Sequence, residues 1–373
     1  MTSSILSGHK RLVIKIGSSL LVGDDHRLDQ PWLEALCDDV AALRVAGHEI
    51  LIVSSGAVAT GSRVLGIDPR RARIDAMQAA AAAGQVELVN AYQKALSRHG
   101  INVAQVLLTP DDTEIKRRFL NARSTLEKLL EHGVVPIINE NDTVATDELR
   151  YGDNDRLAAR VAQTVMADAL VLLSDVDGFY ASDPRSDAGA HFFDVVETIS
   201  DEHMQMAGGT KTVTGSGGMN TKLQAARIAT HAGCVTIIAS GAVMRPLEAL
   251  ARGARHTVFQ AAKSPAAARK QWLAGMLEVR GELHLDEGAA AALANGKSLL
   301  PVGLTGVTGE FARGDAVKLI TTEGKELGRG LAGFSSDEAR AISGCHSERI
   351  EEILGYRGRA VMVHRDDMVL FNP

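Results

Sequence analysis

Apolar runs alternate with helix-periodic segments along the first two thirds of the chain. The runs are apolar throughout rather than at every second position, which predicts strands buried on both faces of a parallel sheet. Between them, apolar residues recur three and four positions apart, and Asp29 and Gly47 mark the two ends of one such helix. The expected strands are 11–17, 49–56, 102–108, 134–139, 169–175 and 234–240, and the expected helices are 30–47, 74–98, 122–133, 155–166 and 220–232.

The pattern changes near residue 260. Beyond it the apolar runs are shorter and are bounded by turn residues, and one alanine-rich helix is expected over 286–296. This predicts a small β-rich domain with its own core. We therefore expect an α/β domain with a mostly parallel sheet over 1–262, a linker with a basic end over 263–279, and the second domain over 280–373.

Composition and charge narrow the function classes. Hydrophobic residues make up 45% of the 373 residues and charged residues 23%, as in folded globular chains. The net charge of −6 argues against broad, nonspecific nucleic-acid binding. Three cysteines without a CxxC pair suit reduced thiols. With neither a signal-peptide pattern nor an apolar run of about 20 residues, a cytoplasmic protein without a membrane segment is expected.

Ligands of such sheets bind beyond the carboxyl ends of the strands, so functional residues are expected in the segments that follow the strands. Lys15 lies in an apolar strand, where it needs a partner unless its side chain reaches the sheet edge. Ser55, Gly56 and Ala57 join a strand to a helix. That helix N-terminus suits a carboxylate or a phosphate, although an ordinary capping serine gives the same pattern.

Two further strand ends carry polar side chains. The loop 139–156 contains Asp142, Asp153, Asn154 and Asp155, which would hold an ammonium group, or a magnesium ion through water. A solvated loop is the usual reading of such a run. The segment 174–185 begins with Ser174 and Asp175, and its Asp-Gly pair predicts a turn and a short hairpin. Such a hairpin would flank a nucleotide base, and its alternative is a plain surface hairpin.

A glycine-rich loop, TGSGGMNTK at 214–222, precedes the last of these helices. It fits neither the Walker loop nor the dinucleotide fingerprint. Its glycines allow a ligand to approach the backbone closely. Thr221 offers a hydroxyl group, and Lys222 offers a positive charge. Together the segments favour phosphoryl transfer between two anionic substrates, because that chemistry needs positioning and charge neutralisation. The segments contain no histidine, which suits a carboxylate acceptor that needs no general base.

Several blocks of sequence resemble a known family. VIKIGSS, VSSGAVATG, RRFLNARSTLEKLL, VVPIINENDTVATDE, YGDNDRLAA and GSGGMNTKLQAA are similar to signature blocks of the glutamate 5-kinases, which are members of the amino-acid kinase family. The tail from about Gly281 resembles a PUA domain. The resemblance implies an αβα sandwich around an eight-stranded, mostly parallel sheet, a small PUA-like barrel, and a homo-oligomer, either a dimer or a tetramer.

The resemblance also implies an activity. The family transfers the γ-phosphoryl group of ATP, accompanied by Mg²⁺, to the side-chain carboxylate of L-glutamate. The product, glutamyl 5-phosphate, leads to proline, and proline inhibits the enzyme. A transient contact with the downstream glutamyl-phosphate reductase is left open.

Residue roles carry over by motif. Lys15 and Lys222 would neutralise the transferring phosphoryl group, and both would contact ATP. Serine replaces the usual threonine in the pair Ser174-Asp175 and in the loop at Ser216, and both replacements keep a hydroxyl group. Glutamate would be held by Ser55, Gly56, Ala57, Asp142, Asp153, Asn154 and Asp155, and ATP also by Ser174, Asp175, Ser216, Gly217, Gly218, Met219, Asn220 and Thr221.

Two alternatives stay open at this stage. One is a sibling kinase acting on acetylglutamate, aspartate or a nucleoside monophosphate, against which the GDND loop and the PUA-like tail argue. The other is an RNA-binding protein, which the acidic net charge disfavours. Arg269, Lys270 and Arg280 leave room only for a small RNA contact.

Overall fold

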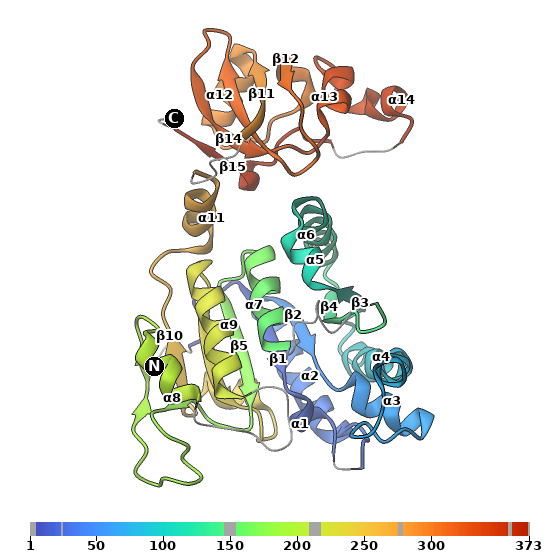
Figure 1. Ribbon diagram of the computed structural model, residues 1–373, viewed down its shortest axis with the longest axis vertical. Coiled ribbons are helices and arrows are strands. Elements are labelled where there is room, and N and C mark those ends of the chain that lie inside the picture. Colours follow the sequence, from blue (N-terminus) through green and yellow to red (C-terminus); the bar gives the residue numbers. More distant parts are fainter. Residues whose placement is uncertain are drawn as a thin grey trace. The chain divides into compact units, whose positions relative to one another are not determined.

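The computed structural model describes residues 5–23, 25–144, 154–208, 218–274, 279–356 and 360–371. The chain divides into two compact units, Met1–Pro265 and Ala266–Pro373, and each is described by itself (Figure 1).

The first unit is built on an eight-stranded sheet with the order β3-β4-β2-β1-β5-β9-β10-β8. The six strands from β3 to β9 are parallel, β10 is antiparallel to β9, and β8 is parallel to β10. The predicted mostly parallel sheet is therefore confirmed. The strands are β1 (Arg11–Ile16), β2 (Glu49–Ser54), β3 (Val103–Leu108), β4 (Val135–Glu140), β5 (Ala169–Ser174), β8 (Val195–Val196), β9 (Val235–Ser240) and β10 (His256–Phe259).

Helices cover both faces of this sheet. On one face lie α2 (Gln30–Val45), α4 (Ile74–Ser97) and α10 (Pro246–Ala251), whose apolar residues share a core with Leu12 and Ile14 of β1. On the other lie α6 (Lys116–Glu131), α7 (Asn154–Thr164) and α9 (Met219–His231), packed around Val13. Successive side chains of a strand point to opposite faces, so burial of both faces explains the uninterrupted apolar runs.

Short helices complete the first unit. The short helices are α1 (Ser18–Leu21), α3 (Ala57–Leu65), α5 (Pro110–Glu114) and α8 (Asp201–Gly208).

Neighbouring helices pack in pairs, and one helix begins before its predicted start. Ribbons of α3 and α4 lie side by side, as do those of α7 and α9 (Figure 1). The start of α6 comes six residues before the expected 122, because Leu120 extends the buried face of the helix.

The second unit contains a five-stranded sheet with the order β12-β11-β13-β14-β15 around a separate core. In the apolar run 298–307, Leu299 forms an isolated bridge with Val363, Pro301 begins a short 3-10 helix, Pro301–Gly303, and β12 begins at Leu304. The strands are β11 (Val279–Leu285), β12 (Leu304–Gly309), β13 (Ala316–Thr321), β14 (Glu326–Leu331) and β15 (Met368–Leu370), and the α-helices are α12 (Glu287–Ala294), α13 (Ser336–Ile342) and α14 (Ile350–Leu354).

The segment expected to be a linker contains a helix, α11 (Pro265–Ala274). Its Leu273 is buried, and Arg269 forms an ion pair of 3.0 Å with the buried Asp367. The guanidinium group of Arg269 also lies 4.5 Å from the ring centre of Trp272. The ion pair with Asp367 connects α11 to the rest of the second unit, while the domain boundaries at 262 and 280 stay predictions.

Candidate active site

The carboxyl ends of four neighbouring parallel strands meet at one edge of the sheet. In the order β4-β2-β1-β5, these strands end at Glu140, Ser54, Ile16 and Ser174. The polar segments that follow each strand in the sequence are therefore close in space. The helices α3, α7 and α9 begin at residues of these segments, and this is where the site is built.

Asp155 lies between two lysines. The Nζ atom of Lys15 is 2.6 Å from its Oδ1 atom, and the Nζ atom of Lys222 is 3.2 Å from its Oδ2 atom. The Oγ1 atom of Thr221 lies 3.1 Å from the same Oδ2 atom. The three charged groups come from β1, the first turn of α7 and the first turns of α9, and they are almost fully buried.

The electrostatics of this trio are set by burial and by the two cations. Burial alone would raise the pKa of Asp155, but the charges and hydrogen bonds of Lys15 and Lys222 outweigh it and hold the pKa below its ordinary value. The carboxylate is therefore ionised at neutral pH. Two ammonium groups around one carboxylate carry a net positive charge at the end of the strands, and such a site attracts an anion.

The side-chain amide of Asn154 links the ends of β2 and β4. Its Nδ2 atom lies 2.8 Å from the carbonyl oxygen of Ser54, 2.9 Å from the Oγ atom of Ser55 and 2.9 Å from the Oδ1 atom of Asn139. Asn139 is buried, and its Oδ1 atom also accepts a hydrogen bond from the backbone N–H of Glu140. Asn154 precedes Asp155, so this amide cluster adjoins the charged trio.

Gly56 forms the left-handed start of α3, with a φ of 100°. A Cβ atom at this position would lie 2.8 Å from Cγ2 of Val22, so both the backbone conformation and the space require glycine. The free N–H groups of a helix point toward its N-terminus, which for α3 follows directly on Ser55 of the amide cluster. This geometry suits a carboxylate ligand.

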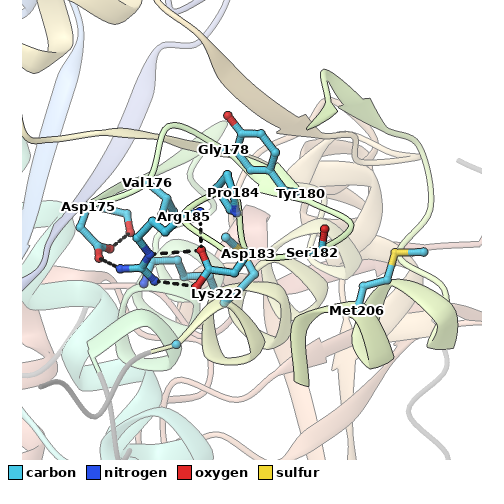
Figure 2. A pocket seen from close by; sticks show the side chains of 13 residues that line it. Asp175, Val176, Gly178, Tyr180, Ser182, Asp183, Pro184, Arg185, Met206 and Lys222 are labelled. Carbon is cyan, nitrogen blue, oxygen red and sulfur yellow. Dashed lines mark hydrogen bonds and ion pairs between the residues drawn. The ribbon is translucent and has the colours of Figure 1, made fainter. Parts of the chain in front are cut away.

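Lys222 also lines a pocket next to the charged trio (Figure 2). Ser174 and Asp175 at the end of β5 and Gly218 and Met219 at the start of α9 line it. The Oγ atom of Ser174 donates to Oδ1 of Asp175 at 3.0 Å. The pocket is also lined by Val176, Gly178, Tyr180, Ser182, Asp183, Pro184, Arg185 and Met206.

A hairpin forms one wall of the pocket. Its strands are β6 (Phe179–Tyr180) and β7 (Phe192–Phe193), and the rings of Phe179 and Phe193 stack at 5.0 Å. In the connecting loop, Arg185 lies 3.5 Å from Asp175 and 3.1 Å from Asp183 (Figure 2). The hairpin thus has a fixed aromatic base and carries charged groups to the pocket.

Most of the predicted site residues lie at this edge. The structure groups Lys15, Asp155, Thr221 and Lys222 into one cluster, and Ser55 and Asn154 into the adjoining amide cluster. Lys15 does not line the pocket, and Asn220 accepts a hydrogen bond from Gln224 instead. Asp142 lies two residues beyond β4 and is half-buried. Asp153, Ser216 and Gly217 lie outside the described residues.

Sequence reasoning missed several residues of the site. Asn139 could have been found from the sequence. It is a polar amide residue at the end of an apolar, buried strand, which is as unusual as the lysine at position 15 within such a strand. Tyr180 ends β6 of the predicted hairpin and Arg185 lies in the loop that follows it, and the sequence does not show that both side chains line the pocket. Asp155 was assigned only to glutamate, and its two lysine partners were not foreseen.

Within residues 5–371, apart from the gaps given above, no group of three or more His, Cys, Asp or Glu side chains is arranged to hold a metal ion. In the same part of the chain, no helix has the length and apolar character needed to cross a membrane.

The fold and the site together define a phosphotransferase. Residues 10–240 match the model of the amino acid kinase family, and residues 281–354 match that of the PUA domain. The first match covers more than half of the chain, so the chain belongs to the amino acid kinase family and carries a PUA domain. The expected family, fold class and enzyme class are confirmed.

Curated relatives named glutamate 5-kinase are similar along nearly the whole chain. The protein of Agrobacterium fabrum is 52% identical over 99% of this chain and 95% of its own length. That of Paramagnetospirillum magneticum is 55% identical over 98% and 99%, and glutamate 5-kinase 1 of Rhizobium meliloti is 54% identical over 99% and 94%. Among solved structures, carbamate kinase from Giardia lamblia bound to AMP-PNP is 19% identical, covering 67% of this chain and 99% of that one with a TM-score of 0.49.

Proposed function

We propose that this chain transfers the γ-phosphoryl group of ATP to the side-chain carboxylate of L-glutamate, giving L-glutamyl 5-phosphate and ADP. The observation that carries the proposal is the pairing of Lys15 and Lys222 on Asp155, between an amide cluster and a pocket. The names of the relatives supply glutamate as the acceptor.

In the proposed mechanism, the two lysines act on the transferring group. The bond from the γ-phosphorus to the bridging oxygen of ADP breaks as a carboxylate oxygen of glutamate bonds to that phosphorus. Lys222 borders the pocket and Lys15 does not, so we assign Lys222 to the leaving side and Lys15 to the acceptor side. Asp155 keeps both ammonium groups oriented, which places positive charge where negative charge develops.

No proton needs to be removed in this reaction. The side-chain carboxyl of free glutamate has a pKa of about 4.3, so the acceptor is already ionised at neutral pH. The chain therefore needs only to position the acceptor. We assign this to Ser55, the N–H groups at the start of α3, and Asn154, with Asp142, Asp153 and Asn139 beside them.

ATP is proposed to bind in the pocket beside Ser174, Asp175 and the start of α9. The kinases of this family use ATP with a divalent metal, and we propose Mg²⁺. Among the described acidic side chains of the site, Asp155 forms ion pairs with two lysines and Asp175 with Arg185. This arrangement fits a metal ion that is bound mainly by the phosphates of the nucleotide. Magnesium bound to the phosphates would offset their charge.

Four further proposals rest on the resemblance to the glutamate 5-kinases. They are that the product enters proline formation, that proline inhibits the enzyme, that the chain forms a dimer or a tetramer, and that the domains divide at 262 and 280. A cytoplasmic location is proposed from the three cysteines, all of which are free thiols.

An acceptor assay tests the proposed function. Purified protein with ATP and Mg²⁺ is incubated with hydroxylamine and with L-glutamate, L-aspartate or N-acetylglutamate in parallel, because hydroxylamine traps an acyl phosphate as a hydroxamate. We expect hydroxamate only with L-glutamate, and less of it when proline is added. Turnover of aspartate or acetylglutamate without turnover of glutamate would show that the acceptor is misassigned.

The substitution Asn154→Ala tests the acceptor side. We expect the KM for glutamate to rise about tenfold, because about one net hydrogen bond to the loop and the acceptor is lost. The KM for ATP should change less than twofold. Steady-state kinetics with each substrate varied in turn measure both values. Asn295→Ala in the second unit, which removes an amide bonded to Ala291, is the control. A rise confined to the KM for ATP would move Asn154 to the other half of the site.

A further inference from the structure

A buried tyrosine on α4 contacts the end of β2, next to the proposed acceptor site. Tyr92 lies on α4 and is 0% exposed, and its hydroxyl oxygen is 3.1 Å from the Oγ atom of Ser54. Burial raises the pKa of Tyr92 well above its ordinary value, and the bond to Ser54 opposes this only in part. The phenol therefore stays protonated and can act as a neutral hydrogen-bond donor.

The hydroxyl group of Ser54 also forms a hydrogen bond to the loop before α3. Its Oγ atom lies 3.3 Å from the carbonyl oxygen of Ser55, to which it donates. A serine hydroxyl has one hydrogen, so when Ser54 donates to Ser55 it accepts from Tyr92. The directed chain is then Tyr92 to Ser54 to the carbonyl of Ser55. The backbone carbonyl of Ser54 also accepts the amide of Asn154 at 2.8 Å.

The orientation of the Ser55 carbonyl determines where the next N–H group points. In a trans peptide, the carbonyl of Ser55 and the N–H of Gly56 point in opposite directions. Holding the carbonyl toward the hydroxyl group of Ser54 therefore directs this N–H away from that hydroxyl group. Among the described residues, the N–H of Gly56 has no hydrogen-bond partner. It is thus a donor that an acceptor carboxylate would use.

The same helix fixes the other end of the loop. A Cβ atom on Gly84 of α4 would lie 1.9 Å from the carbonyl oxygen of Ala57, and one on Gly61 of α3 would lie 1.7 Å from that of Ala80. The backbones of α3 and α4 are in direct contact at these glycines. The two helices lie side by side (Figure 1). A rigid α4 thus touches the loop at Ser54 through Tyr92 and at Ala57 through Gly84.

We propose that Tyr92 is a positioning residue of the acceptor site, which orients the Ser55–Gly56 peptide through the hydroxyl group of Ser54. The role rests on the proposed function, because the ligand of this peptide is the phosphoryl acceptor. Tyr92 itself does not touch the acceptor. It acts by keeping one backbone donor and the Ser55 side chain in the orientation that binds a carboxylate.

The substitution Tyr92→Phe tests this role, because it removes the hydroxyl group and keeps the ring. We expect the KM for glutamate to rise about five- to tenfold, with the KM for ATP and kcat changed less than twofold. Thr164→Val, which removes a buried hydroxyl bonded to Arg160 near the far end of α7, is the matched control and should leave both KM values unchanged. A merely structural tyrosine would lower the melting temperature without this difference between substrates.

A double-mutant cycle tests the route through Ser54. Tyr92→Phe, Ser54→Ala and the double variant are compared by the KM for the acceptor. If the contact runs through Ser54, the double variant should resemble Ser54→Ala alone, because neither variant keeps a complete chain. Effects that multiply would overturn this route, and an unchanged KM in Tyr92→Phe would overturn the positioning role.

The cycle is run with whichever of the three carboxylate acceptors the wild-type protein phosphorylates. Failure of glutamate alone would then overturn the proposed function, and the effect of Tyr92→Phe on the active acceptor would still decide the positioning role.

Discussion

Replacing Lys222 by alanine is expected to lower kcat by about 10²- to 10³-fold, because one cation that stabilises the transferring phosphoryl group is removed. The KM for glutamate should change little, since the amide cluster does not include Lys222. Steady-state and single-turnover kinetics with saturating ATP measure the loss, and circular dichroism checks that the fold is intact.

The control for this variant is Lys128→Ala. Lys128 is an exposed lysine on α6 that pairs with Glu131 on the surface, so its loss should change kcat less than twofold. Lys222→Arg should not restore the rate, because the planar guanidinium differs in size and geometry from the ammonium group that Asp155 orients. Full turnover by Lys222→Ala would remove this lysine from the mechanism.

Replacing Asp155 by asparagine is expected to affect stability and rate together. The change leaves two buried ammonium groups without their shared counter-ion, and breaking such a buried set costs about 3–5 kcal/mol. A fall in the melting temperature of about 6 °C or more should follow. We also expect kcat to fall about 10²-fold or more, because both lysines lose their orientation. Calorimetry and steady-state kinetics measure the two effects.

Asp39→Asn is the matched control for Asp155→Asn. Asp39 is a buried aspartate that pairs with Arg245 and accepts N–H groups at the start of α10, away from the strand ends of the site. We expect this variant to lose stability while its kcat stays within about twofold of wild type, because it touches no proposed substrate group. A similar loss of kcat in both variants would mean that Asp155 acts only through stability.

The pKa of Asp155 gives a further readout for the same variant. The folded state holds this pKa below the unfolded value, so the stability it contributes is present above about pH 4 and is lost as the pH falls through the folded value. The stability difference between wild type and Asp155→Asn should therefore be constant from about pH 5 to pH 8 and shrink in stronger acid. A difference that shrank already near pH 6 would contradict the lowered pKa.

Periodicity was enough to predict the sheet and most of its helices. Continuous apolar runs identified β1, β2, β4, β5 and β9, because burial on both faces leaves a clear signal in six-residue strands. The strands β8 and β10 have only two and four residues, which is too short for a pattern. Helix α11 lies in the predicted linker because its basic residues do not reveal the ion pair of Arg269 with the buried Asp367 of the same unit.

The sequence predicts most residues of the site, but it does not predict which of them form ion pairs and hydrogen bonds with each other. Parallel strands bring their carboxyl ends to one edge of the sheet, so the residues at and beyond these ends are candidates for the site. This rule identifies Lys15, Asn154, Asp155 and Lys222. That Asp155 joins the two lysines depends on strand order and helix placement, which no local pattern contains. Tyr92 follows the apolar period of α4, so only the crossing of α3 and α4 shows where its hydroxyl group points.

The position of Lys15 within a central strand has a consequence for the order in which the chain can fold. Both neighbours of β1 in the sheet, β2 and β5, flank a strand whose lysine is buried, and burying an unpaired ammonium group costs several kcal/mol. The partner, Asp155, lies far downstream and is synthesised much later. During translation, pairing of β1 with β2 alone therefore leaves a charged Lys15 without this partner until α7 has emerged. The carboxylate therefore stabilises the assembled domain before any substrate is bound.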